Sequence, residues 1–266
     1  MEYKTILVNR MDGGITLTIN RPEQQNSINP DLLKEINHVL DLAVNDPLCK
    51  IIVLQGQGGV FCTGMDFNEI SGKHDNFTPG QIHENRDSKE VSHSRPYLET
   101  IKRFTLIPRI VISVVDGRVM AGGVGLAAAS DIVIATPRSQ FSLSEALWGL
   151  LPSMVTPFLI RRVGFQVAYR MTLTTMPIHA REAYEVHLVD EVTEAPEEVL
   201  RRYSLRVSRL DEWTLGNLKQ YFRKMWIISN QMEDAAVAET DRLSSEPKVV
   251  NNIINFVKYQ KFPWSE

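Results

Sequence analysis

Residues 111–145 read VISVVDGRVMAGGVGLAAASDIVIATPRSQFSLSE, and this stretch decides the fold. It begins with Val111–Val115, a continuous β-branched apolar run that is typical of a strand buried on both faces. A glycine turn follows, and the small residues Val124–Ala129 favour a short helix packed closely on a sheet. We expect a second strand after this helix, and then a polar hairpin that carries Glu145. The order of these elements predicts an α/β fold.

The glycine turn before the predicted helix is a candidate site for negative charge. Backbone N–H groups in the first turn of a helix have no internal partner, and the helix dipole favours an anion there. Gly122 and Gly123 would let a ligand approach the backbone closely. A turn of this kind is also common as a purely structural feature. Gly117, Gly122 and Gly125 do not match the G-x-G-x-x-G fingerprint of dinucleotide sites.

A second turn of the same type lies upstream, in residues 51–70, which read IIVLQGQGGVFCTGMDFNEI. Ile51–Leu54 predicts another buried strand, and a glycine-rich turn follows it. Asp66 then stands where a short helix begins, and a capping role is expected for it. Two such corners in one domain would bring two N–H donors to one carbonyl oxygen, as acyl-thioester chemistry requires to stabilise an enolate.

Five segments, in this order, resemble the crotonase (enoyl-CoA hydratase/isomerase) superfamily over nearly the whole chain. They are Asn20–Ile28, Phe61–Asp66, Asp116–Leu126, Ser130–Ala135 and Phe141–Gly149. The resemblance implies a ClpP/crotonase-like spiral of ββα units with a C-terminal helical region. It implies a core domain over residues 1–195, and helices over residues 196–266 that cover the site and build a homotrimer, often paired into a hexamer.

The same resemblance implies the residues of the site. The N–H groups of Met65 and Gly122 would form the oxyanion hole, and Glu145 would be the acid and base at the α carbon. The expected substrate-binding residues lie in three short segments of the chain. They are Gln25, Ser27 and Ile28 on the phosphopantetheine arm, Gly64, Asp66 and Phe67 beside the thioester, and Gly123.

One position departs from the pattern of the family's hydratases. Those enzymes place a second glutamate just after the glycine run, where this chain has Gly125. The remaining carboxylate, Glu145, would take a proton from the α carbon. It would then return that proton either to a leaving β-hydroxyl, which gives dehydration, or to a γ carbon, which gives isomerisation. The residues alone leave both outcomes open.

A narrower resemblance favours dehydration. Segments 118–125, 141–145, 157–164 and 261–264 are similar to the dehydratases of bacterial polyketide β-branching cassettes. These convert 3-hydroxy-3-methylglutaryl to 3-methylglutaconyl on an acyl carrier protein, so a lyase with that partner is implied. The alternatives are an enoyl-CoA isomerase or hydratase of small acyl-CoA substrates, the 3-methylglutaconyl decarboxylase of the same cassette, and a non-catalytic scaffold.

Composition excludes several classes of function. A net charge of −3 gives no basic field for nucleic acid. Two cysteines in 266 residues argue against a disulfide framework and indicate the cytoplasm. We see no signal peptide or membrane span, and we expect no metal or redox cofactor, the acyl group being carried on phosphopantetheine. Because acyl carrier proteins are acidic, a local basic patch is expected, with Arg118 as a candidate.

The rest of the chain yields structural expectations. Residues 4–10 and 14–20 predict a hairpin, and a helix should begin at Pro30 with Asn29 as its cap. Gly72–Asp87 predicts a loop, and helical patterns follow over 91–104, 197–210, 211–230, 232–244 and 248–259. The remaining polar candidates divide into two sets. We expect solvated or structural roles for His74, His83, His93, Asp131, Arg161 and Arg162. Arg95, Lys102 and Arg103 are expected to be surface charges, with one of them as a candidate for facing a substrate carboxylate.

Overall fold

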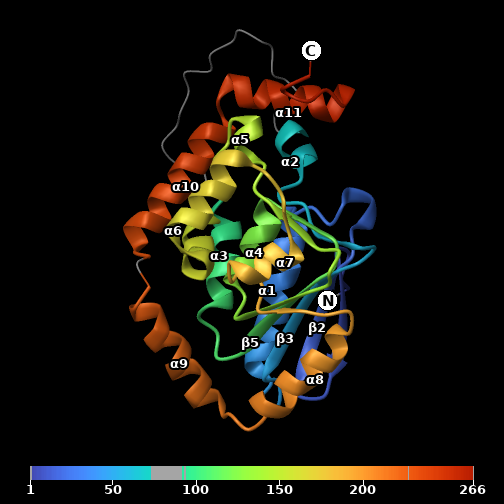
Figure 1. Cartoon of the computed structure of the whole chain (residues 1–266), viewed down its shortest axis with the longest axis vertical. Coiled ribbons are helices and arrows are strands. Elements are labelled where there is room, and N and C mark those ends of the chain that lie inside the picture. Colours follow the sequence, from blue (N-terminus) through green and yellow to red (C-terminus); the bar gives the residue numbers. More distant parts are fainter. Residues whose placement is uncertain (1, 73–91, 93, 227, 266) are drawn as a thin grey trace.

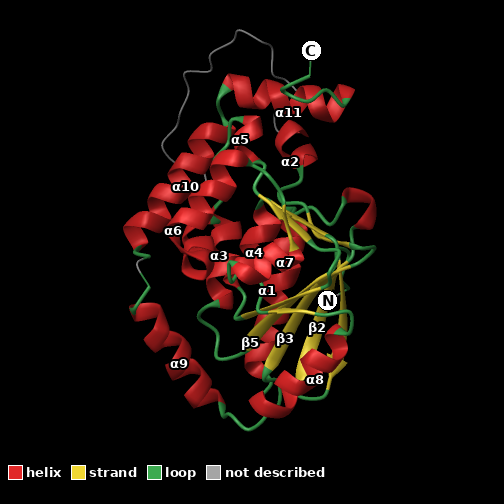
Figure 2. Ribbon diagram, in the orientation of Figure 1, coloured by secondary structure: helices red, strands yellow, loops and turns green. Residues whose placement is uncertain are grey.

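The computed structural model describes residues 2–72, 92, 94–226 and 228–265 (Figure 1). Two sheets form its centre, and helices cover them (Figure 2). The six-stranded sheet runs in the order β1 (Ile6–Met11), β2 (Gly14–Ile19), β3 (Ile51–Gly56), β5 (Ile110–Val115), β7 (Ile132–Ala135) and β10 (Glu191–Val192). The four-stranded sheet runs β4 (Val60–Cys62), β6 (Arg118–Met120), β8 (Gln140–Ser142) and β9 (Ile178–His179).

The chain alternates between these sheets in ββα units. It passes from β3 to β4 and α2 (Phe67–Gly72), from β5 to β6 and α4 (Gly122–Ala129), and from β7 to β8 and α5 (Glu145–Trp148). Strands β3, β5 and β7 pair in parallel, and so do β4, β6 and β8. This repeated crossover is the predicted crotonase spiral, and it places the ends of β4 and β6 side by side.

One local prediction is wrong. No hairpin follows β7, because β7 and β8 lie in different sheets and β8 pairs in parallel with β6. Glu145 is instead the first residue of the short helix α5. The predicted hairpin of β1 and β2 is confirmed, with antiparallel register and Gly13 at φ +69° in its turn.

Helix α1 (Pro30–Asn45) shows how the sequence determines an element here. The Asn29 side chain accepts the Leu32 N–H, as expected of a helix cap, and Pro30 occupies the first position. Its apolar face, including Leu32, Ile36 and Leu40, is buried in the main core. Helix α4 differs, because all of its residues are buried and mostly small, so that strands and helices pack on every side of it.

The remaining helices form the outer layer. They are α3 (Arg95–Phe104), α6 (Thr156–Thr174), α7 (Ala180–Glu185), α8 (Pro196–Val207), α9 (Glu212–Lys224), α10 (Asn230–Ser244) and α11 (Pro247–Tyr259). Helices α3 and α9 are shorter than predicted, beginning at Arg95 and ending at Lys224. Helix α11 packs on α2 at the end of the molecule near the C-terminus (Figure 1). The domain boundary at residue 195 stays a prediction.

Three cationic side chains proposed as carboxylate binders are already paired. Arg95 contacts Asp234, Lys102 contacts Glu233, and Arg103 contacts Asp41. These pairs tie α3 to α10 and to α1, and none of the three cations lines the site cavity described below. The expected loop over 72–87 falls, after Gly72, outside the described residues, as do His74, His83 and His93. No helix within the described ranges is long and apolar enough to cross a membrane.

Candidate active site

A cavity of about 590 Å³ lies where β6, α2, α4, α5 and α11 meet. Of the predicted site residues, seven line it: Gln25, Ser27, Met65, Asp66, Phe67, Gly122 and Glu145. The other three pack behind its wall. Ile28 is fully buried and lies against Gly122, Gly64 lies against Ala121, and Gly123 lies against the backbone of Cys62. The catalytic and binding roles assigned to these residues stay predictions.

The two glycine corners approach each other closely. Gly64 has φ +91°, and a Cβ atom placed on it would lie 2.7 Å from the Ala121 Cβ and 3.1 Å from the Gly122 nitrogen. Glycine is therefore required at Gly64 both for its backbone angle and for the approach. The next residue, Met65, is thereby placed beside the start of α4. The N–H groups of Met65 and Gly122 must lie this close if both are to donate to one oxygen.

Both predicted oxyanion donors are available. Ile28 forms a parallel bridge with Met65: the Ile28 N–H donates to the Gly64 carbonyl at 2.7 Å, and the Asp66 N–H donates to the Ile28 carbonyl at 2.8 Å. Neither the Met65 N–H nor the Gly122 N–H donates a hydrogen bond to any other described residue. Gly122 is also the first residue of α4, where the helix dipole favours negative charge.

Ala121, just before this donor, has a strained backbone. Its φ of 48° and ψ of −122° lie in a region that L-residues rarely adopt. The Ala121 N–H donates to the Ser142 carbonyl of β8 at 3.0 Å, which holds the residue in place. Strain of this kind persists only where the surroundings enforce it, and it gathers at functional sites.

Glu145 supplies the titratable group of the cavity. Its Oε2 atom is buried without a hydrogen-bond partner among the described residues, although the residue as a whole is half-buried. Burial raises the pKa of Glu145 to about 7, because the charged carboxylate is poorly solvated there. Near neutral pH the group can both accept and return a proton, which is what an acid–base catalyst requires.

Asp66, another carboxyl group that lines the cavity, has a structural role. It pairs with Arg21 at 2.7 Å, and its Oδ1 accepts the Asn68 N–H at 3.1 Å at the start of α2. Although burial opposes ionisation, the hydrogen bonds from Arg21 and Asn68 hold the pKa of Asp66 below its ordinary value. A carboxylate so stabilised is a poor proton carrier.

Arg118 and Gln25 stand together in the cavity wall. Arg118 is exposed on β6, and its guanidinium donates to the Gln25 side chain. The pair lies on the same cavity as the oxyanion corners. It offers one positive charge and an amide to a polar or phosphate-bearing arm.

The structure adds one residue that the sequence motifs did not indicate, and it brings aromatic residues of separate segments together. Tyr97 of α3 lines the cavity, although no motif surrounds it. An aromatic cluster packs beside the cavity, with Phe67 and Phe256 meeting Trp148 edge-on at centroid distances of 4.8 and 5.1 Å. Phe262, from the C-terminal tail, also contacts Trp148 and lines the cavity. Residues of the C-terminal region therefore line one side of the cavity, and the covering role expected of that region stays a prediction.

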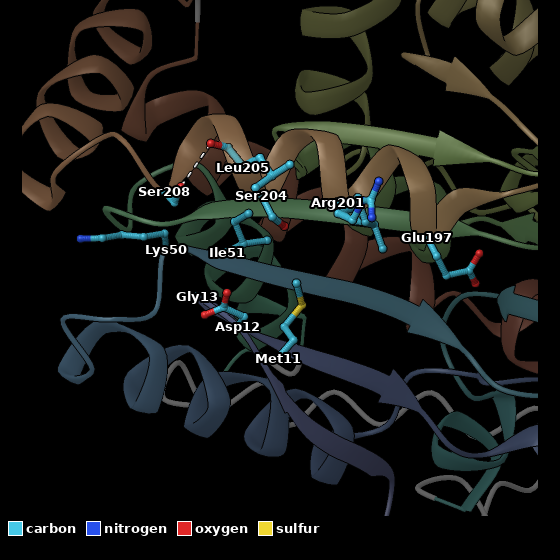
Figure 3. A pocket seen from close by; sticks show the side chains of 11 residues that line it. Met11, Asp12, Gly13, Lys50, Ile51, Glu197, Arg201, Ser204, Leu205 and Ser208 are labelled. Carbon is cyan, nitrogen blue, oxygen red and sulfur yellow. Dashed lines mark hydrogen bonds between the residues drawn. The ribbon is translucent and has the colours of Figure 1, made fainter.

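Two further cavities lack this chemistry. One, of about 360 Å³, lies between α8 and strands β1 and β3 (Figure 3). It is lined by apolar side chains such as Ile51 and Leu200 and by Glu197 and Arg201, and neither of its carboxyl groups, Asp12 and Glu197, is buried. The other, of about 740 Å³, lies between α6 and α9 and is lined by Phe222 and Trp226. Across the described ranges, no three His, Cys, Asp or Glu side chains gather as a metal site would require.

Comparison with known proteins identifies the family of the chain. The model of the enoyl-CoA hydratase/isomerase family matches residues 10–266. The chain belongs to the enoyl-CoA hydratase/isomerase family. Membership agrees with the crotonase spiral and with an enzyme of the hydro-lyase type.

Individual members of the family share much of the chain. The bacillaene synthase dehydratase PksH of Bacillus subtilis (strain 168) is 35% identical over 264 residues, which cover 99% of this chain and 98% of that protein. A crystal structure of PksH from Bacillus subtilis, described as a polyketide biosynthesis enoyl-CoA hydratase, has a TM-score of 0.87 and 34% identity, covering 98% of this chain and 100% of that one. A trans-2-decenoyl-[acyl-carrier-protein] isomerase of Streptococcus mutans is 27% identical, covering 85% and 83%.

Proposed function

We propose that the protein is a dehydratase of polyketide β-branching, which converts 3-hydroxy-3-methylglutaryl-acyl carrier protein to 3-methylglutaconyl-acyl carrier protein. The observation that carries the proposal is the carboxyl group of Glu145, whose Oε2 atom is buried without a hydrogen-bond partner among the described residues and which lines the same cavity as the two free N–H donors. The similarity to PksH, a dehydratase of bacillaene synthase, supports the substrate class.

The reaction follows from this geometry. The thioester oxygen accepts the Met65 and Gly122 N–H groups, which lowers the pKa of the C2 protons and stabilises the enolate. Ionised Glu145 takes a C2 proton. The enolate then re-forms the carbonyl and expels the C3 hydroxyl, which receives the proton held by Glu145 and leaves as water. Because one group serves as base and then as acid, a pKa near neutrality suits both steps.

The arm that carries the acyl group would enter past Gln25 and Arg118. No cofactor is required beyond phosphopantetheine, on a carrier protein or on CoA. Carrier proteins are acidic, and the exposed Arg118 at the cavity is a suitable contact for such a partner. We assign the reaction to the cytoplasm, in keeping with two buried free cysteines, Cys49 and Cys62.

We further propose that the enzyme is a homotrimer, alone or paired into a hexamer. Large apolar side chains are exposed beside the 740 Å³ cavity, among them Phe165 and Phe222, which are 67% and 65% exposed. Exposed apolar groups gathered at one place are typical of a contact surface. A second copy of this chain is the partner that a family of oligomers implies.

Two alternative reactions use the same site. An isomerase would return the proton to a γ carbon, and the 27% identity to an acyl-carrier-protein isomerase favours this candidate. A decarboxylase of the same cassette would use the oxyanion corners without an essential Glu145.

Mass spectrometry of the loaded carrier protein distinguishes these reactions. The wild-type enzyme is incubated with 3-hydroxy-3-methylglutaryl, 3-methylglutaconyl and a simple 2-enoyl thioester, each on the carrier protein. We expect loss of one water from the first substrate only. Loss of carbon dioxide from the second would assign the decarboxylase. A shifted double bond in the third leaves its mass unchanged and is detected by proton NMR of the acyl group; such a shift without water loss from the first substrate would assign the isomerase.

A further inference from the structure

Tyr97 is a buried phenol in the wall of the catalytic cavity, and the mechanism above gives it no task. It belongs to α3 and is 1% exposed. Its hydroxyl donates to the Gly122 carbonyl oxygen at 2.7 Å. Because a buried tyrosine hydroxyl usually finds one partner, the bond alone is compatible with ordinary core packing. What distinguishes Tyr97 is its partner, because the carbonyl belongs to the residue whose N–H is a predicted oxyanion donor.

Two glycines of α4 make room for the phenol. Gly122 and Gly125 are three residues apart, so they share one face of the helix. A Cβ atom on Gly125 would overlap the Tyr97 hydroxyl, and one on Gly122 would lie 3.5 Å from ring atoms Cε2 and Cζ. The ring therefore packs directly on the first turn of α4, which is the turn that presents the Gly122 N–H to the cavity.

The same turn follows the strained residue of the site. Ala121 is held on one side by its hydrogen bond to the Ser142 carbonyl at 3.0 Å. On the other side, the Tyr97 hydroxyl holds the carbonyl of the next residue, Gly122. The backbone is thus hydrogen-bonded on both sides of the Gly122 N–H, at the Ala121 N–H and at the Gly122 carbonyl. Such bonds keep a strained segment in one orientation.

We propose that Tyr97 is a positioning residue of the reaction, whose hydroxyl fixes the Gly122 carbonyl and thereby restrains the backbone angles of Gly122, so that the Gly122 N–H on the neighbouring peptide unit stays directed at the thioester oxygen. The inference rests on the proposed function only in that the site forms an enolate. Burial raises the pKa of Tyr97 well above its ordinary value, and the charges of Cys62 and Glu145 act in the same direction. The hydroxyl therefore stays protonated and remains a donor throughout the working pH range.

Tyr97→Phe tests the proposal, because it removes the hydroxyl and keeps the ring. The readout is the exchange of C2 protons for solvent deuterium in a 3-methylglutaryl thioester, which has no hydroxyl to lose and so reports enolate formation alone. Loss of one oxyanion donor lowers the rate about 10²–10³-fold. We expect a misdirected donor to lower the rate of C2 proton exchange by about tenfold or more. KM should change less than about twofold, since the cavity keeps its shape.

Tyr203→Phe is the matched control. Tyr203 also donates its hydroxyl to one partner, Glu191 at 2.8 Å, but it lies on α8 away from the cavity. This variant should exchange C2 protons as fast as the wild type. Thermal unfolding of both variants shows whether each is folded. Should Tyr97→Phe fail to fold, Gly125→Ala, which displaces the hydroxyl without removing it, should slow exchange in the same way.

The outcomes separate the two claims. If folded Tyr97→Phe exchanges C2 protons within about twofold of the wild type, the positioning role is wrong and Tyr97 is a core residue only. If the wild type exchanges C2 protons but releases no water from 3-hydroxy-3-methylglutaryl thioester, the proposed function fails instead. In that case the comparison of exchange rates still decides the role of Tyr97.

Discussion

The carboxyl group of Glu145 has a pKa of about 7 because burial disfavours its charged form. Since the proposed reaction begins with the carboxylate, kcat/KM should rise with pH through a single ionisation and level off above about pH 7. Below that midpoint we expect about a tenfold loss for each pH unit. Initial rates of water loss between pH 5 and 8.5 measure this profile. A flat profile would rule out Glu145 as the base.

The same ionisation predicts a stability effect. The pKa of Glu145 is higher in the folded state than its ordinary value of 4.5, so its contribution to stability is complete below pH 4.5 and is lost as pH rises through about 7. The wild type should lose on the order of 1–3 kcal/mol of unfolding free energy over this range that Glu145→Gln does not lose. Urea unfolding of both proteins at pH 5 and pH 8 provides the comparison.

Glu185→Gln is the control for that experiment. Glu185 is exposed on α7, where it pairs with Arg181, and it lies away from the cavity. Its replacement should leave the difference in stability between pH 5 and pH 8 as in the wild type. If Glu145→Gln and the wild type respond to pH equally, Glu145 is not desolvated as described.

At the scale of elements, α4 is held at its C-terminus by two half-buried arginines of α6. The Arg161 side chain donates to the Ala128 carbonyl at 2.6 Å and to the Ser130 carbonyl at 3.0 Å, and Arg162 donates to the Ser130 carbonyl at 2.7 Å. The final carbonyls of a helix lack internal partners, and cations are favourable there. The structural role expected for this arginine pair is thus confirmed, on a helix other than their own.

Arg161→Ala should therefore destabilise the protein without altering its chemistry. The variant loses two hydrogen bonds, which costs about 1–3 kcal/mol, because Arg162 still donates to the Ala128 and Ser130 carbonyls. Measured at a temperature where the variant is folded, kcat should stay within about twofold of the wild type, because the N-terminus of α4 keeps its own supports. Arg181→Ala, on the surface of α7, is the control and should be neutral. A stable Arg161→Ala variant would contradict the role of Arg161.

The elements also show how far local sequence patterns reach. Buried strands such as β3 and β5, and the glycine turns after them, were predicted because β-branched runs and glycines act locally. The prediction of a hairpin before Glu145 was wrong, because a polar turn does not reveal that the next strand, β8, joins the four-stranded sheet. Tyr97 was missed for a related reason. Its partners in α4 are distant in sequence, and only the packing of α3 on α4 brings them together.

At the scale of the whole molecule, helix α9 exposes large apolar side chains that nothing in the described residues covers. Trp213 and Phe222 of α9 are 77% and 65% exposed, beside a cavity lined by Met225 and Trp226. If this surface joins three copies, the mass in solution should be a multiple of three chains. Phe222→Glu should then shift the protein to monomers, since a charge within an apolar contact is costly. Sedimentation equilibrium measures both masses, and a wild-type monomer would contradict the proposed trimer.

The most direct test of the central claim compares water loss by the wild type and by Glu145→Gln, with 3-hydroxy-3-methylglutaryl-acyl carrier protein as the substrate. The variant keeps the size of the side chain and the oxyanion corners but has no group to accept the C2 proton. We expect the wild type to yield the dehydrated carrier protein, and the folded variant to be slower by about 10²–10⁴. Equal rates would contradict the account, because the reaction would then proceed without the carboxyl group to which the account assigns the proton transfer.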